Sequence, residues 1–76
     1  MVEFNGKKYD SRHGGPFDRG SADSWYSRAY NPHYYLGDIR MHTHRIVEVQ
    51  DMTSKEIDEY AAGFNYNEQY GGKKEY

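Results

Sequence analysis

The clearest structural signal in the chain is the stretch Thr53-Ser54-Lys55-Glu56-Ile57-Asp58-Glu59-Tyr60-Ala61-Ala62-Gly63-Phe64. It opens with a capping box, in which the Thr53 hydroxyl and the Glu56 carboxylate satisfy each other's unpaired backbone amides at a helix start. Apolar side chains then recur at i, i+3, i+4 and i+7, which places them on one helical face. The stretch predicts an amphipathic helix, and Gly63 either ends that helix or allows a neighbour to approach closely.

A second amphipathic pattern lies upstream, after Asp18. Its apolar side chains also share one helical face and predict a helix of about three turns with Trp25 as the anchor: Ala22, Trp25, Tyr26 and Ala29. Asp18 or Ser21 is the expected N-cap. Asn31-Pro32 is the expected end, because the residue before a proline is disfavoured in the α region.

Two turn signals predict β-hairpins. Asn5-Gly6 tolerates the positive φ of a type I′ turn and separates two short runs, 2–4 and 7–9. Gly37-Asp38 separates Tyr34-Tyr35-Leu36 from Ile39-Arg40-Met41 in the same way. Apolar side chains alternate from Ile39 to Val49 with a break near His44, which indicates a bulge or a turn. We expect a two- or three-stranded antiparallel sheet, with the N-terminal strand as its optional third member.

These elements predict an α+β fold, with two short helices packed on a small antiparallel sheet. The 76 residues allow only one core. We assign a single small domain to residues 1–64 and a polar, flexible tail to residues 65–76. The expected core consists of Phe4, Phe17, Ala22, Trp25, Tyr26, Leu36, Ile39, Val47, Val49, Ile57, Tyr60, Ala61 and Phe64.

Composition narrows the function classes. The chain has no Cys, which excludes disulfides, thiolate zinc sites and a thiol nucleophile and favours an intracellular location. The net charge of −2 excludes a global field that attracts nucleic acid or anionic lipid. We expect neither a signal peptide nor a membrane span. The nine Tyr residues suit interfaces and half-buried positions better than a dry core.

Catalytic and metal motifs are sparse. No nucleophile elbow, phosphate-cradling glycine loop or spaced carboxylate pair occurs, and Gly14-Gly15-Pro16 lacks the Lys and Ser/Thr of a P-loop. His42 and His44 would lie on one side of a strand and, with His13 or His33, supply imidazole ligands. Two histidines on a solvated strand face need no metal, so we expect no cofactor. Because catalytic motifs are missing, we also expect no enzymatic activity.

Arginines and aromatic side chains alternate along residues 12–45, which hold all the arginines of the chain. This combination is typical of protein interfaces. It is also the chemistry of phosphate contact and base stacking, so RNA stays open as a partner. The predicted binding residues are Arg12, Arg19, Trp25, Arg28, Tyr30, His33, Tyr34, Tyr35 and Arg40.

Two stretches resemble a short protein family of tailed phages, including those of marine cyanobacteria. The first is Arg12-His13-Gly14-Gly15-Pro16-Phe17-Asp18-Arg19-Gly20-Ser21-Ala22-Asp23-Ser24-Trp25-Tyr26-Ser27-Arg28, followed by Asn31-Pro32-His33-Tyr34, and the second runs from Met52-Thr53 to Gly63-Phe64. Together they cover about two thirds of the chain. The resemblance implies a viral protein made in the cytoplasm of the host cell, and it implies no activity.

A fainter likeness is to bacterial ribosome modulation factor. Arg19-Gly20, Ala22, Arg28 and Pro32 are similar to its first helix, and Tyr60, Gly63 and Phe64 to the end of its second. The factor is strongly basic, whereas this chain is mildly acidic.

The leading hypothesis is a small phage accessory protein that binds a host or viral protein without catalysis. An RNA- or ribosome-associated factor and a minor virion structural or assembly protein are the alternatives, and a homodimer could bury surplus tyrosine rings.

Overall fold

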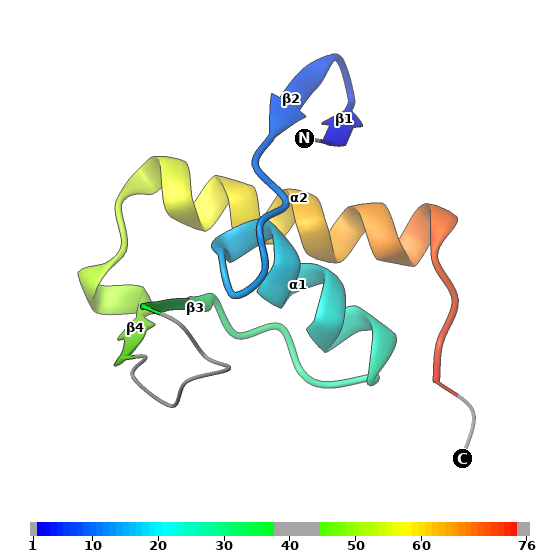
Figure 1. Cartoon of the computed structure of the whole chain (residues 1–76). Helices are drawn as coiled ribbons and strands as arrows, with labels where there is room; N and C mark the ends of the chain where they lie inside the picture. The colour runs from blue at the N-terminus through cyan, green and yellow to red at the C-terminus, as the bar shows by residue number, and fades with distance from the viewer. Residues whose placement is uncertain (1, 38–44, 75–76) are drawn as a thin grey trace.

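The computed structural model describes residues 2–37 and 45–74. It contains two helices and two antiparallel hairpins, which confirms the predicted α+β class (Figure 1). In chain order, the elements are β1 (Val2–Phe4), β2 (Lys7–Tyr9), α1 (Pro16–Trp25), β3 (His33–Leu36), β4 (Arg45–Glu48), the 3-10 turn η2 (Val49–Asp51) and α2 (Ser54–Tyr70). The long helix α2 is the centre of the fold: α1 lies against it, and the two hairpins lie on opposite sides of it (Figure 1).

The hairpin β1–β2 has the predicted turn. Asn5 and Gly6 have φ values of 52° and 79°, the left-handed region that a type I′ turn requires. Val2 pairs with Tyr9 and Phe4 with Lys7. The pairing directs Phe4 onto α2, where its ring packs edge-to-face with the Tyr66 ring at a centroid distance of 5.7 Å. The hairpin is thereby fixed to the helix by aromatic packing.

The second hairpin differs from the expectation. Strand β3 pairs with β4, so that Tyr34 lies opposite Val47 and Leu36 opposite Arg45. The expected partner strand at 39–41 and most of the expected bulge region lie outside the described residues. Among those described, β1–β2 and β3–β4 form separate sheets, and the N-terminal strand does not join the second one. The reason is that β1 and β2 pack their own aromatic rings, Phe4 and Tyr9, against the helices.

Helix α1 begins and ends earlier than expected. Its N-cap is Gly15 with Pro16 at the first helical position, while Asp18 accepts a hydrogen bond from the Gly14 amide at 2.9 Å. The helix stops at Trp25 because Ser27 adopts a left-handed conformation with φ of 58°. The Arg28 and Ser27 amides then donate to the carbonyls of Asp23 and Ser24 at 2.8 and 3.1 Å, which is a Schellman motif.

The two helices touch through glycines. A Cβ atom added at Gly20 would lie 2.8 Å from the Phe64 nitrogen, and one added at Gly63 would lie 2.8 Å from the Phe17 carbonyl carbon. The helix backbones are therefore in direct contact. Close approach is the correct alternative for Gly63, because α2 continues past it to Tyr70.

The buried face of α1 is not the predicted one. It consists of small, polar or ring side chains, and the sequence pattern of apolar residues did not identify it: Pro16, Phe17, Gly20, Asp23 and Ser24. Trp25 and Tyr26 are exposed, so the expectation that they anchor the core is wrong. The physical reason is that glycine-mediated contact with α2 selects the smallest face of the helix for burial.

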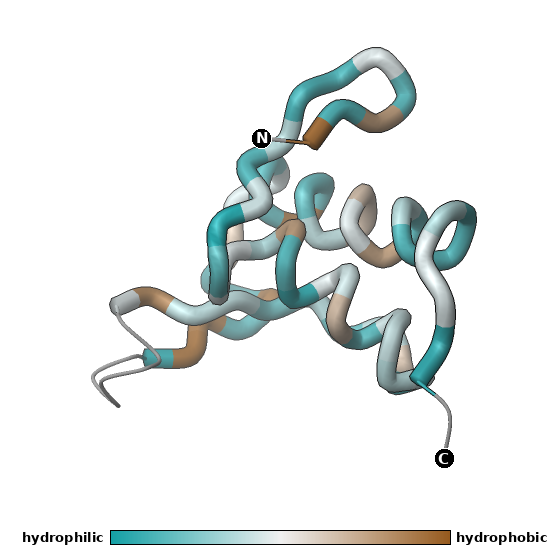
Figure 2. The backbone as a smooth tube through the Cα atoms, turned by 45° about the vertical axis from the view of Figure 1, so that its right-hand side comes forward, coloured by the Kyte–Doolittle hydropathy of each residue, from teal (hydrophilic) through white to brown (hydrophobic). Residues whose placement is uncertain are grey.

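Two aromatic clusters form the core. One contains Phe4, Tyr9, Phe17 and Ala62, and the other contains Tyr34, Val47, Met52 and Tyr60. Of the expected core, Phe4, Phe17, Val47 and Tyr60 are buried, Leu36 and Val49 are exposed, Ala22, Ile57, Ala61 and Phe64 are half-buried, and Ile39 lies outside the described residues. Figure 2 shows few strongly hydrophobic residues along the chain. The reason is that tyrosine, which has a low hydropathy value, supplies much of this core.

Residues 65–70 are helical rather than part of a polar tail. The chain after α2 then turns back along the end of α1. Asn67 is buried, and its side-chain amide donates to the Ser24 hydroxyl at 2.9 Å and to the Gly72 carbonyl at 3.0 Å. The Lys73 ammonium reaches the Ser24 carbonyl at 2.9 Å and the Glu68 carboxylate at 2.6 Å. These contacts hold residues 71–74 against α1.

Candidate functional site

A buried carboxylate lies behind the end of α1. Asp23 is only 4% exposed and accepts a hydrogen bond from the phenol of Tyr60, which is fully buried in α2. The Tyr60 oxygen in turn accepts the Asn31 amide at 3.2 Å. Burial and the adjacent Asp23 carboxylate raise the pKa of Tyr60 far above its ordinary value, so this phenol stays protonated as a donor.

Two further residues face the same carboxylate. The guanidinium of Arg28 approaches one Asp23 oxygen at 3.5 Å, and Nδ1 of His33 lies 3.8 Å from the other. His33 Nδ1 also lies 2.7 Å from the Asn31 carbonyl oxygen. Asp23 therefore ties together α1, the segment after it, β3 and α2, and it fixes the backbone that carries Arg28 and Tyr30.

An exposed aromatic and cationic surface lies outside this buried group. We call it the α1-end surface and define it as Trp25, Tyr26, Arg28 and Lys74. Trp25 is 40% exposed, and the side chain of Arg28 is 59% exposed. The Arg28 and Lys74 cations lie 4.8 and 5.0 Å from the centroid of the Tyr26 ring. Such distances are those of cation–π contacts.

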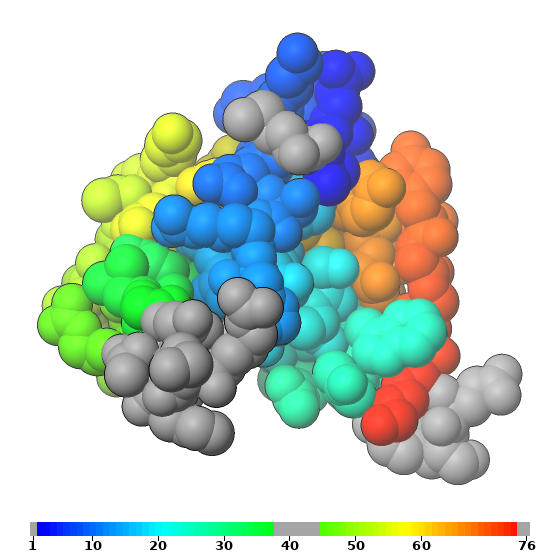
Figure 3. Space-filling view, in the orientation of Figure 1, coloured from blue at the N-terminus to red at the C-terminus, as the bar shows by residue number. Residues whose placement is uncertain are grey.

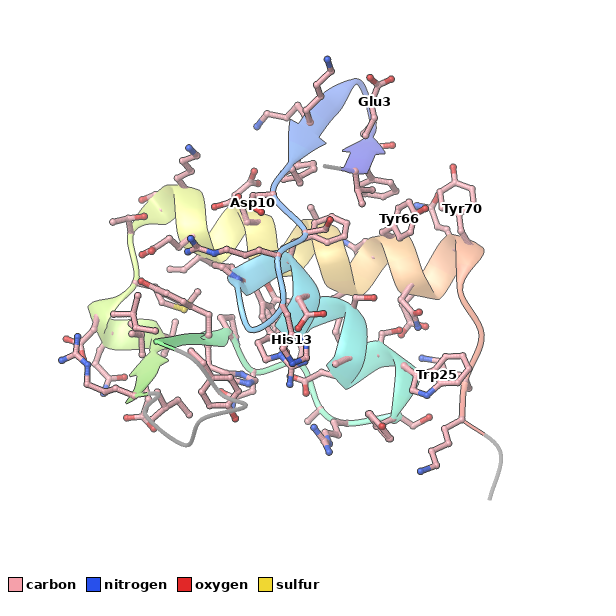
Figure 4. All side chains as sticks on the ribbon, viewed as in Figure 1. Glu3, Asp10, His13, Trp25, Tyr66 and Tyr70 are labelled. Carbon is pink, nitrogen blue, oxygen red and sulfur yellow. The ribbon has the colours of Figure 1, made fainter. Side chains whose placement is uncertain are left out.

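The tail completes this surface. The Lys74 amide donates to the Trp25 carbonyl at 2.7 Å. Figure 4 shows Trp25 at the end of α1 next to the tail that follows α2, and Figure 3 shows the atoms of the two segments in contact. Tyr30 follows on the same loop and is 51% exposed, with its ring set edge-on against Tyr60 and Phe64. Three exposed aromatic rings, Trp25, Tyr26 and Tyr30, thus lie at the end of α1 and on the loop after it.

The predicted binding residues do not form one surface. Trp25, Arg28 and Tyr30 belong to the end of α1 and its loop. Arg12 is exposed in the loop before α1, where its carbonyl oxygen accepts the Gly15 amide at 3.1 Å. Arg19 is largely covered, because its guanidinium binds Asp18 at 2.6 Å and lies over the Tyr35 ring at 5.7 Å. Arg12 precedes α1 and Arg19 lies in its first half, whereas Trp25 is its last residue.

Three other predicted binding residues, Tyr34, Tyr35 and His33, are buried or half-buried in the fold. Tyr34 is buried in the core, where a hydrogen bond with Glu56 raises the pKa of its phenol. Its ring is therefore not available as an exposed contact. Tyr35 is half-buried, and the His33 side chain is 13% exposed beside Asp23. Arg40 lies outside the described residues, as do His42 and His44 of the metal hypothesis.

Sequence reasoning missed two members of the α1-end surface. Tyr26 was expected in the core, and Lys74 was expected in a flexible tail. The Lys73-Lys74 pair after Gly71-Gly72 was the only local signal, and it does not reveal that the tail folds back onto Trp25. Contacts between residues about 50 positions apart along the chain cannot be inferred from local patterns.

The described residues offer little catalytic or metal chemistry. Residues 2–37 and 45–74 contain no group of three His, Asp or Glu side chains arranged to hold a metal ion. The best-formed polar cluster, around Asp23 and Tyr60, is closed to solvent. No helix in this part of the chain is long and apolar enough to cross a membrane. The α1-end surface presents exposed rings and cations to solvent.

Comparisons with protein-family models, with curated proteins and with solved structures found no match for this chain.

Proposed function

We propose that this protein is a non-enzymatic binding module that recognises a host or viral protein through the α1-end surface and Tyr30. The observation that carries the proposal is the exposure of Trp25 at the end of α1 and of Arg28 and Tyr30 on the loop after it, whose backbone is fixed from behind by Asp23 and Tyr60. Trp, Tyr and Arg are the residues that dominate binding energy at protein interfaces.

Rigidity of the loop supports a role in recognition. A binding segment that is ordered before contact loses less conformational entropy on association, which improves affinity at a given contact area. Here the Schellman motif, the Asn31–Tyr60 hydrogen bond and the packing of Tyr30 on α2 all restrain one exposed segment.

The test is affinity capture of the tagged protein from a lysate of the cells that carry its gene. Three proteins are compared: the wild type, Trp25→Ala, and Ile46→Ala as the matched control, since Ile46 is an exposed apolar side chain on β4. We expect a protein captured by the wild type and by Ile46→Ala, and reduced at least tenfold with Trp25→Ala. Equal capture by all three proteins would show that the surface is the wrong one.

The same experiment separates the RNA alternative. Capture is repeated after nuclease treatment and at high salt, because phosphate contacts weaken linearly with the logarithm of salt concentration. A partner that survives both treatments supports the proposal. Recovery of RNA or ribosomal subunits that is lost with salt would replace it with the RNA-associated reading.

A further inference from the structure

Two positive charges converge on one aromatic ring at the α1-end surface. The Arg28 guanidinium carbon lies 4.8 Å and the Lys74 ammonium 5.0 Å from the centroid of the Tyr26 ring. The two cations come from segments that are far apart in the sequence and are brought together by the tail. Because like charges repel, a nearby anion would stabilise this arrangement.

The Arg28 guanidinium makes a single ion pair with the described residues, a long 3.5 Å contact with Asp23, whose carboxylate also accepts from Tyr60 and faces His33. A guanidinium has five N–H donors, so a side chain that is 59% exposed keeps donors for another acceptor. No carboxylate among residues 2–37 and 45–74 lies within ion-pair distance of the Lys74 ammonium.

The backbone of both cationic residues, Arg28 and Lys74, is held by hydrogen bonds to α1. Arg28 is the residue whose amide closes the Schellman motif, at 2.8 Å from the Asp23 carbonyl. Lys74 donates its amide to the Trp25 carbonyl, and the preceding Lys73 binds Ser24 and Glu68. The backbone positions of both residues are therefore set before a ligand arrives, which lowers the entropy cost of binding.

We infer that the ligand of this site is a carboxylate side chain of a protein partner, bound by Arg28 and Lys74, with a neighbouring apolar side chain against Trp25. The inference rests on the proposed function and adds the chemistry of the partner segment. A guanidinium matches a carboxylate in two parallel hydrogen bonds. A nucleic acid fits less well, because the two cations lie over the Tyr26 ring where a base would stack, and the chain has a net charge of −2.

The test uses a display library of random peptides, selected on the full-length protein. We expect the enriched peptides to share an Asp or Glu next to an aliphatic or aromatic residue. Binding of one such peptide is then measured by fluorescence anisotropy. Changing its acidic residue to the amide, or Arg28→Ala in the protein, should weaken binding at least tenfold, and Lys74→Ala should weaken it about threefold.

Lys74→Ala and one control variant keep the outcome interpretable. Lys74→Ala alters no buried group, so it tests the site even if Arg28→Ala destabilises the fold around Asp23. Arg12→Ala is the matched control, because Arg12 is an exposed arginine before the other end of α1, and it should leave the affinity unchanged within twofold. Equal loss with Arg12→Ala would indicate non-specific charge attraction and overturn the inference.

Failure of this inference is distinct from failure of the proposed function. Enriched peptides that lack an acidic residue but lose binding with Trp25→Ala would overturn the carboxylate ligand and leave the binding surface in place. Selected peptides that ignore Trp25, Arg28 and Lys74 alike would remove both. Single-stranded oligouridine that binds more tightly than any selected peptide, and depends on Arg28, would also overturn the carboxylate and favour phosphate.

Discussion

Replacing Gly63 with alanine tests the direct contact between the helix backbones. The added Cβ would lie 2.8 Å from the Phe17 carbonyl carbon and 2.9 Å from the Phe17 Cα, and closer still to the carbonyl oxygen. Ordinary carbon contacts lie at about 3.5–4.0 Å, so the helices must separate by roughly 1 Å. The obstacle is backbone, which cannot rotate away as a side chain would.

The magnitude follows from two opposing effects. Alanine is about 1 kcal/mol more favourable than glycine within a helix. Overpacking costs about 1–3 kcal/mol, and a backbone clash at the main helix contact belongs at the upper end of that range. The net effect is a loss of about 2 kcal/mol in the free energy of unfolding. For a domain of this size, that lowers Tm by about 8–16 °C.

Thermal and urea unfolding followed by circular dichroism measures this loss. Asn65→Ala is the matched control, because Asn65 is exposed on the same helix and its replacement should change stability by less than about 0.7 kcal/mol. A Gly63→Ala protein that melts at or above the wild-type temperature would refute the close helix contact.

Three further substitutions test local features by unfolding experiments. Ser27→Gly should stabilise the protein by about 0.5–1 kcal/mol. It relieves a left-handed conformation that costs a non-glycine residue about 1–2 kcal/mol, and the greater entropy of glycine in the unfolded chain offsets part of that gain. A loss of stability would argue against the Schellman motif at the end of α1. Thr53→Ala should cost about 1 kcal/mol by removing the capping box of α2, and an unchanged urea midpoint would contradict it. Tyr60→Phe should cost about 1.5–3 kcal/mol at pH 7 through the lost hydrogen bond to the Asp23 carboxylate. The folded-state pKa of Tyr60 is raised, so its stabilising contribution is complete below pH 10 and decreases above it. The difference between wild type and Tyr60→Phe should therefore shrink by about 1.4 kcal/mol at pH 11, and a constant difference from pH 8 to pH 11 would contradict the raised pKa.

Signals that act within a few residues predicted the structure well. The Asn5-Gly6 turn and the Thr53–Glu56 capping box both form as expected, because each depends on backbone conformations and hydrogen bonds between near neighbours. The helix start at Thr53 needs no information from the rest of the chain. The α+β class follows from such local elements together with the short length of the chain.

The packing of α1 could not be predicted from its apolar pattern. The face that meets α2 contains Gly20, Asp23 and Ser24, and a search for hydrophobic periodicity passes over all three. Asp23 and Ser24 are buried because partners from α2 and the tail satisfy them, and those partners are about 40 residues away. The same contacts direct Trp25 outward. One cause therefore explains why Trp25 and Tyr26 were wrongly expected in the core and why Tyr26 was missing from the predicted binding residues.

The candidate site was therefore predicted in part. Trp25, Arg28 and Tyr30 were among the expected binding residues and do lie on exposed surface at the end of α1. The arginines near the start of α1 are separate from them, and Tyr34 is buried. Lys74 joins the surface only because the chain turns back after α2, which no nearby residues specify.

Site-specific photocrosslinking tests most directly whether the end of α1 contacts a protein. A photoreactive amino acid replaces Ala29, which is exposed between Arg28 and Tyr30, or Lys8, an exposed residue on strand β2, as the control position. After irradiation in cells, we predict a discrete nuclease-resistant protein adduct from position 29 and none from position 8. An adduct that nuclease removes, or the same adducts from both positions, would contradict the account.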